Sequence, residues 1–149
     1  MLAIRPATPA DAGDIFLLIT ELADFEQLRH QVSGNAAALS ADLFGPRPAV
    51  WALVAEWEGA VVGFALYFLN YSTFLCKPGL YLEDLYVRPA VRGKGIGIAL
   101  LKATEAVARE RGCGRLEWSV LDWNSNAIAF YEAFGARPNE GWTVYRKTL

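Results

Sequence analysis

The stretch AVRGKGIGIALL, residues 90–101, holds three glycines at alternate positions, Gly93, Gly95 and Gly97. Arg92 and Lys94 stand among them, and an apolar run typical of a helix follows at once. Glycines let a backbone approach a ligand closely, and the free N–H groups of a first helical turn attract an anion. The stretch therefore predicts an anion-binding loop between a strand and a helix.

The charge of this region differs from that of the rest of the chain. Residues 1–84 carry ten acidic and four basic residues, whereas residues 85–104 carry four basic residues and no acidic one. Residues 105–149 carry six of each, and the net charge is −2. A cationic island in an acidic chain suits a small polyanion, because a nucleic acid needs a broad basic face. We expect no nucleic-acid partner.

Hydrophobic periodicity around the loop predicts an α/β fold with a mixed sheet. Thr8 and Pro9 are suited to the N-cap and first position of the first helix. The expected order is β-α-α-β-β-β-α-β-α-β in a single domain, residues 1–149. The expected strands are 2–7, 49–57, 60–70, 79–87, 114–121 and 142–149, and the expected helices are 8–28, 35–45, the run from the glycines to about 112, and 124–135.

Composition excludes several classes of protein. Apolar residues make up 54% of the chain, which is enough for a full core, but no apolar run approaches the ~18 residues of a membrane span. The first residues do not resemble a signal peptide, so we expect a cytoplasmic protein with no membrane partner. Cys76 and Cys113 lack metal-ligand spacing, and His30 is the only histidine. We therefore expect neither a metal site nor a Ser-His-Asp triad.

Phosphate-binding motifs narrow the choice of anion. A Walker A loop needs Ser or Thr after its lysine, but Gly95 follows Lys94, and no dinucleotide fingerprint fits the glycines. The pattern that fits is R-x-x-G-x-G, from Arg92 to Gly97. It resembles the acetyl-CoA pyrophosphate loop of the GCN5-related N-acetyltransferases (GNAT). The segments 4–26, YLEDLYV at 81–87 and VLDWNSNAIAFYEAFGA at 120–136 resemble the diamine acetyltransferase branch, of the spermidine/spermine and thialysine type.

The resemblance implies a GNAT fold and a set of functional residues. Acetyl-CoA would be the co-substrate, Tyr131 the general acid and Glu83 a catalytic carboxylate. Glu26 and Glu83 would lie near the amine, and Asn124 would contact the cofactor. The other residues expected to bind acetyl-CoA are Leu85, Tyr86 and Val87, through their backbone, and Arg92, Gly93, Lys94, Gly95, Ile96, Gly97 and Ile98 at the pyrophosphate.

Acetyl transfer to an amine needs such groups on chemical grounds as well. An alkylamine of pKa ~10.4 is mostly protonated at neutral pH, so a carboxylate must take up its proton. The oxyanion formed on the thioester needs an N–H donor, and the leaving thiolate needs a proton. Glu83 and Asp84 should point to opposite faces of their strand, so that at most one faces the amine directly.

The sequence leaves the substrate open. Phe74 stands where the polyamine enzymes lead us to expect a tryptophan. We expect an enzyme that acetylates a primary amine of a small cationic metabolite, such as a polyamine, a diamine or a thialysine-like compound. The alternatives are a protein or peptide acetyltransferase and a non-catalytic acyl-CoA-binding module. We also expect a homodimer, since the family is commonly dimeric and Trp142 lies on a candidate edge strand.

Overall fold

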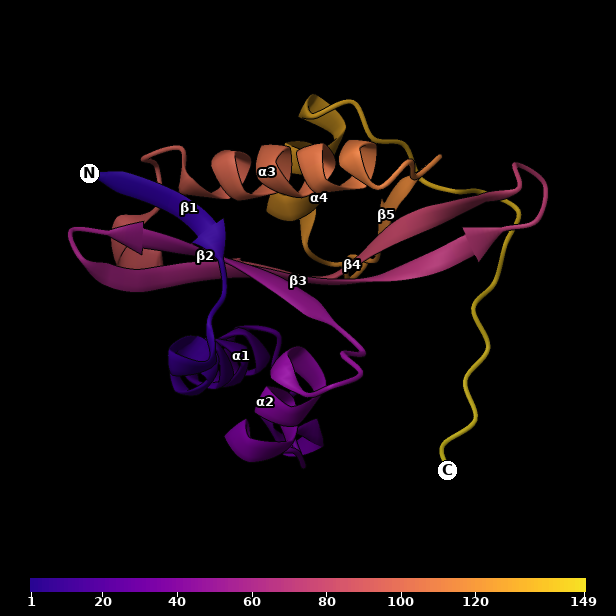
Figure 1. Cartoon of the computed structure of the whole chain (residues 1–149). Coiled ribbons are helices and arrows are strands. Elements are labelled where there is room, and N and C mark those ends of the chain that lie inside the picture. The colour runs from indigo at the N-terminus through magenta and orange to yellow at the C-terminus, as the bar shows by residue number, and fades with distance from the viewer. The chain divides into compact units, whose positions relative to one another are not determined.

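A five-stranded sheet forms the centre of the computed structural model, which describes all residues 1–149. The strands follow chain order in space, and only β4 and β5 pair in parallel (Figure 1). Glu58 and Gly59 both have positive φ and close the β2–β3 hairpin tightly. The mixed sheet agrees with the expected fold class. The strands are β1 Leu2–Pro6, β2 Trp51–Trp57, β3 Ala60–Ser72, β4 Lys77–Val87 and β5 Leu116–Trp118.

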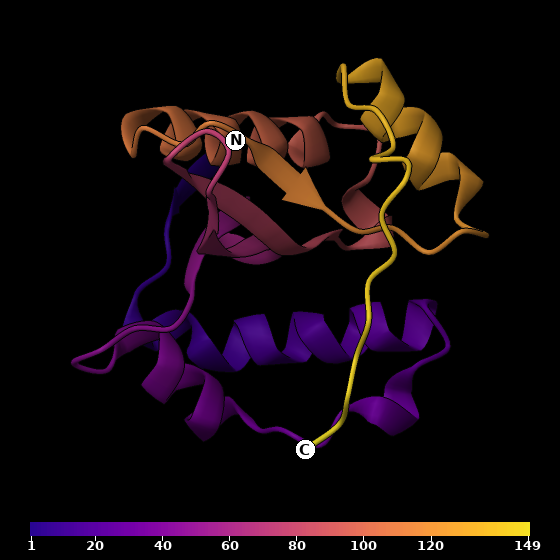
Figure 2. The ribbon, with the colours of Figure 1, turned by 90° about the vertical axis from the view of Figure 1, so that its right-hand side faces the viewer.

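Helices cover both faces of this sheet. Helices α1 (Ala12–Phe25) and α2 (Ala36–Phe44) lie on one face, and α3 (Ile96–Glu110) lies on the other (Figure 1, Figure 2). The core under α1 is closed by Ile15, Leu18, Val54, Phe64 and Tyr86. On the other face, Leu100 and Leu101 of α3 are fully buried. Three single 3₁₀ turns complete the first part of the chain, at Pro9–Asp11, Arg29–Gln31 and Pro89–Val91.

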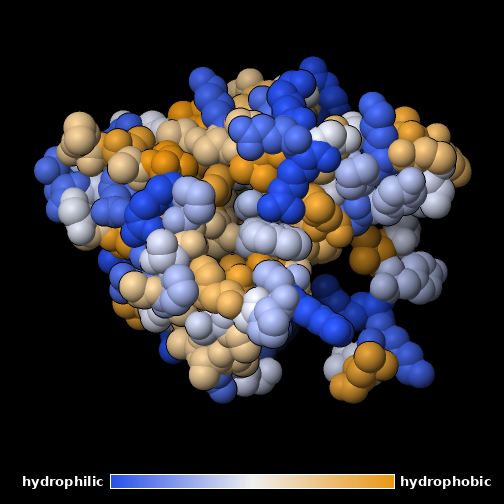
Figure 3. Space-filling model, in the orientation of Figure 1, coloured by the Kyte–Doolittle hydropathy of each residue, from blue (hydrophilic) through white to orange (hydrophobic).

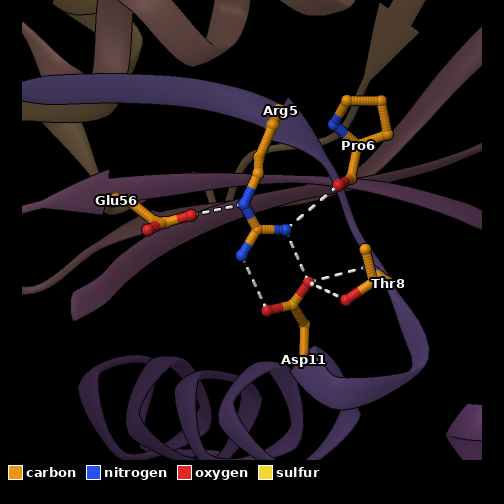
Figure 4. Close-up of polar contacts among 5 residues, drawn as sticks. All are labelled: Arg5, Pro6, Thr8, Asp11 and Glu56. Atoms are coloured by element: carbon orange, nitrogen blue, oxygen red, sulfur yellow. Dashed lines mark hydrogen bonds and ion pairs between the residues drawn. The ribbon is translucent and has the colours of Figure 1, made fainter. Parts of the chain in front are cut away.

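An ion-pair network fixes the turn from β1 into α1 (Figure 4). Asp11 accepts hydrogen bonds from the Thr8 N–H at 2.7 Å and from two guanidinium nitrogens of Arg5 at 2.7 and 3.0 Å. Arg5 also donates to Glu56 on β2. These bonds lower the pKa of Asp11 to about 2, with the Arg5 bond as the largest cause. The predicted N-cap Thr8 and first-turn Pro9 are confirmed, with the helix beginning as a 3₁₀ turn.

The chain divides into two compact units, Met1–Trp118 and Ser119–Leu149. The second unit contains one regular element, α4 (Ser125–Ala133). The strand predicted at 142–149 is absent from the structure, and the fifth strand is shorter than predicted. A strand is stable only when it is paired, and the second unit has no other strand to pair with. Figure 3 shows that the stretch leading to the C-terminus carries both hydrophilic and hydrophobic residues.

Candidate active site

A β-bulge interrupts β4 where the sequence places its two acidic residues. Leu66 of β3 lies opposite Asp84, and Tyr67 lies opposite Leu82. Glu83 is therefore left without a partner on β3, which is the pattern of a bulge with one extra residue. The bulge changes which side of the strand each later backbone group faces.

Two hydrogen bonds show this change of side. Before the bulge, the Leu80 N–H donates to the Arg115 carbonyl at 3.0 Å, on the side of β5. After it, the Arg88 N–H donates to the Val62 carbonyl at 2.9 Å, on the side of β3. Since backbone groups alternate along a strand, the even-numbered residues have exchanged sides.

The exchange turns the backbone groups of Leu85 and Val87 toward the β5 side. No residue of β5 faces them there, because β5 ends at Trp118, the partner of Leu82. N–H groups on such an open edge can bond a carbonyl oxygen or a developing oxyanion. Leu85 and Val87, two of the three residues expected to contact the thioester through their backbone, therefore have N–H groups that could donate to it.

Tyr86, the third of these residues, has a different position. Its partner in the β3 register is Phe64, and its backbone faces β3. Its side chain is buried, and its hydroxyl donates to Glu21 Oε1 at 3.4 Å. Burial is the largest cause of the raised pKa of Tyr86. The structure thus makes Tyr86 part of the support beneath the site.

The carboxyl group of Asp84 is affected by those of Glu83 and Glu26. Burial raises the pKa of Asp84 to about 7, and the charges of Glu83 and then Glu26 add to the effect. Burial also raises the pKa of Glu26, which follows the last residue of α1. Glu83 is exposed. The residue expected as the catalytic carboxylate is Glu83, whereas the group with the raised pKa in the structure is the half-buried Asp84.

The glycine loop enters α3 without a capping side chain. Gly95 is the N-cap residue, and Gly93 and Gly95 have φ of 80° and 78°, in the left-handed region that favours glycine. Gly97 and Ile98 follow within the first helical turn, whose N–H groups have no intrahelical acceptor. Ile96 is buried and anchors this turn to the core. The loop therefore has the geometry that an anion requires.

The two cations of the loop contact aromatic rings. The Lys94 Nζ lies 5.4 Å from the centroid of the Trp57 ring. The Arg92 guanidinium lies 5.6 Å from the ring centroids of both Phe25 and Tyr86, and its Nε donates to the Val87 carbonyl at 2.8 Å. The Arg92 side chain is thus held by the protein itself.

The remaining expected residues lie in the second unit. Asn124 is the N-cap of α4, and its Oδ1 accepts a hydrogen bond from the Ala127 N–H at 3.3 Å. Tyr131 lies on the same helix, with its ring 5.5 Å from that of Phe130 in an edge-on arrangement. Among the described residues, no group of three His, Cys, Asp or Glu side chains is arranged to hold a metal ion. None of the helices combines the length and apolarity that crossing a bilayer requires.

Comparison with known families identifies this arrangement. Residues 17–136, which include β4, the glycine loop and α4, match the model of the acetyltransferase (GNAT) family. The chain belongs to this family. Its open β4 edge and uncapped loop thus belong to an acetyltransferase, and membership implies acetyl-CoA as the co-substrate.

Individual relatives cover nearly the whole chain. A thialysine N-ε-acetyltransferase of Mus musculus is 44% identical, over 96% of this chain and 90% of the relative. An L-ornithine N5-acetyltransferase of Arabidopsis thaliana is 34% identical, over 97% of this chain and 83% of the relative. An aminoglycoside acetyltransferase from a soil metagenomic sample has a similar fold, with a TM-score of 0.81 over 99% of this chain and 96% of that chain, at 21% identity.

Proposed function

We propose that the protein transfers the acetyl group of acetyl-CoA to the side-chain amine of a small cationic amino acid, of the thialysine or ornithine type. Relatives with these two activities cover nearly the whole chain. The carboxyl groups of Glu26, Glu83 and Asp84 would attract a substrate that carries an ammonium group. The proposal includes the cytoplasmic location and the homodimer expected from the sequence.

The half-buried carboxyl of Asp84, on which the charges of Glu83 and Glu26 act, is the observation that carries the proposal. A general base works best when its pKa lies near the operating pH, and the pKa of Asp84 is raised to about 7. We assign to Asp84 the removal of a proton from the substrate ammonium. Glu83 and Glu26 then attract the cation and keep the pKa of Asp84 high.

The open edge of β4 supports the next step. The freed amine attacks the thioester carbonyl, and an oxyanion forms on its oxygen. The N–H groups of Leu85 and Val87 are suited to donate hydrogen bonds to this oxyanion, because no β5 residue lies opposite them. The glycine loop, residues 93–98, would hold the pyrophosphate and thereby fix the thioester along this edge.

We propose Tyr131 as the general acid that protonates the departing thiolate. The tetrahedral intermediate collapses to the amide and the thiolate of CoA, and the nitrogen loses its second proton. A tyrosine hydroxyl can protonate the thiolate and recover its proton from water. The net reaction converts an ammonium ion and acetyl-CoA into an amide, CoA thiol and one proton.

The test is release of CoA thiol from acetyl-CoA with a panel of acceptors. The panel contains thialysine, ornithine, lysine, spermidine and a lysine-containing peptide. We expect the highest kcat/KM with thialysine or ornithine. Turnover with the peptide alone would favour a protein acetyltransferase, and tight CoA binding with no thiol release would favour an acyl-CoA-binding module. Either result contradicts the proposal.

Tyr131→Phe tests the acid separately. The change removes only the hydroxyl, so we expect a fall in kcat of ~10²–10⁴-fold, with little change in acetyl-CoA affinity. Steady-state kinetics and a melting curve on the same variant distinguish this role from packing. Unchanged kcat, under conditions where chemistry limits the rate, would remove Tyr131 from the mechanism.

A further inference from the structure

We propose that Arg92 is a positioning residue that couples the acetyl-CoA site to the amine site. The proposal rests on the proposed function, because it concerns how its two substrates affect each other. Arg92 is the residue that leads from the 3₁₀ turn Pro89–Val91 into the glycine loop. Its side chain reaches back to the ends of α1 and β4.

The Arg92 side chain holds three elements together. Its Nε donates to the carbonyl of Val87, the last residue of β4. Its guanidinium lies 5.6 Å from the ring centroid of Phe25, the last residue of α1, and equally far from that of Tyr86. A planar guanidinium can stack on rings and donate a hydrogen bond at the same time, which an ammonium group does less well.

The end of α1 is where this contact matters for the substrate. Glu26 directly follows Phe25, and its charge acts on Asp84. Gln27 then turns the chain with φ of 61°, which is uncommon for a residue with a side chain. A ring fixed at Phe25 therefore fixes the backbone from which the Glu26 side chain extends.

A second link holds the same helix one turn earlier. Glu21 pairs with Arg88 through Nη2 at 3.0 Å and Nε at 3.2 Å. Glu21 and Phe25 are four residues apart and share one face of α1. The Glu21–Arg88 pair thus holds the body of α1 against the end of β4, whereas Arg92 acts on its last turn.

These contacts give acetyl-CoA binding a route to the amine site. Pyrophosphate bound at residues 93–98 would fix the loop backbone and with it the start of the Arg92 side chain. The guanidinium would then hold Phe25, and Glu26 would keep its place near Asp84. Thermodynamic linkage makes the effect reciprocal. CoA and the amine each tighten the binding of the other by the same factor.

The test is calorimetric titration of thialysine into the protein with and without saturating CoA, which prevents turnover. In the parent protein we expect CoA to tighten thialysine binding by ~5-fold or more. In Arg92→Met the tightening of thialysine binding by CoA should fall below ~2-fold. The variant keeps an aliphatic side chain of similar length but loses the guanidinium group. Arg92→Lys should not restore the factor. Phe25→Leu, which changes a partly exposed ring, should lose it in the same way.

Lys94→Gln is the matched control. It removes a cation from the same loop, but Lys94 contacts Trp57 and not α1. We expect weaker CoA binding with the coupling factor intact at saturating CoA. The inference is overturned if the parent shows no coupling, if Arg92→Met and Phe25→Leu keep it, or if Lys94→Gln loses it equally. Failure of the parent to acetylate thialysine or ornithine would instead overturn the proposed function.

Discussion

Asp84 and Glu83 are neighbours in the chain, but their environments differ. Glu83 is exposed, whereas burial and two nearby carboxylates make ionisation of Asp84 costly. Because the pKa of Asp84 is higher in the folded than in the unfolded chain, folding loses stability as the pH rises from about 4 to about 7. An ammonium group bound beside it would offset this cost.

Asp84→Asn should therefore stabilise the protein while it removes the proposed base. At pH 8 we expect a higher Tm than in the parent, by about 2–4 °C for each kcal/mol regained, and a large loss of kcat. At pH 4 the difference in Tm should vanish, because the parent carboxyl is protonated there. Melting curves at the two pH values check this. A Tm at pH 8 equal to or below that of the parent would contradict it.

The sequence predicted the acidic pair but not that Asp84 is the less exposed of the two, with the raised pKa. Strict alternation along a strand placed Glu83 and Asp84 on opposite faces. The bulge could not be predicted, because nothing in a run of apolar residues marks an extra residue in one strand. One feature of the sequence is consistent with the bulge. Tyr86 and Val87 are adjacent and both apolar, and in the structure both are buried. Arg92 was predicted as a ligand of the cofactor from its motif. Its contact with Phe25 joins residues far apart in the chain, which no local pattern reveals.

The loop before α3 depends on two glycines whose conformation few other residues adopt. A side chain at Gly95 would have open space, with Ile98 as its only near contact at 3.9 Å, so the cost of substitution comes from φ of 78°. A branched side chain would also hinder the approach of a pyrophosphate to the backbone.

Gly95→Val should weaken CoA binding beyond detection in calorimetry while the fold persists. Gly112→Val is the matched control, because Gly112 follows the other end of α3, has φ of 70° and has open space around it. We expect both variants to lose similar stability and only Gly95→Val to lose CoA. CoA affinity of Gly95→Val equal to that of the parent would show that the pyrophosphate binds elsewhere.

Asp11 should make the β1–α1 turn sensitive to acid. Its pKa falls from 3.8 to about 2 on folding, so its stabilisation is complete above about pH 4 and is lost as the pH falls through about 2. The shift corresponds to about 2 kcal/mol. Denaturant unfolding should show Asp11→Asn less stable than the parent at pH 7, by a difference that shrinks at pH 3. Asp14→Asn, an exposed acid in the first turn of α1, is the control and should show neither effect.

Helix boundaries could be predicted closely because their signals are local. The helix predicted at 35–45 is observed as α2, with Asn35 as its N-cap and Gly45 at its end. Strand lengths could not be predicted so well, since they depend on pairing partners elsewhere. Leu116–Trp118 pairs over three residues where eight were predicted, and residues 142–149 form no strand despite a strand-like composition.

Exposed large apolar residues bear on how copies of the chain associate. Trp142, Val144 and Tyr145 are 74%, 87% and 92% exposed, and Phe74 at the β3–β4 turn is 87% exposed. Exposed large apolar side chains of this kind are candidates for an interaction site. We keep a homodimer as the prediction.

Sedimentation at micromolar concentration should show a species of twice the 16.4 kDa chain mass. Replacing Trp142 and Tyr145 together by serine should shift the equilibrium toward single chains, whereas Thr143→Ser should not. A parent protein that sediments only as a 16.4 kDa species would contradict the prediction.

The bulge at Glu83 also suggests how such a site could arise in evolution. The three strands from β2 to β4 form a plain antiparallel meander apart from two bulges. Inserting one codon into β4 exchanges the sides that the later amides of the strand face, so that those of Leu85 and Val87 turn away from β3. Removing it would return the amides of Leu85 and Val87 to β3 and turn the amide of Tyr86 to the edge that β5 leaves unpaired. A single insertion or deletion event thus decides which amides of β4 face its unpaired edge.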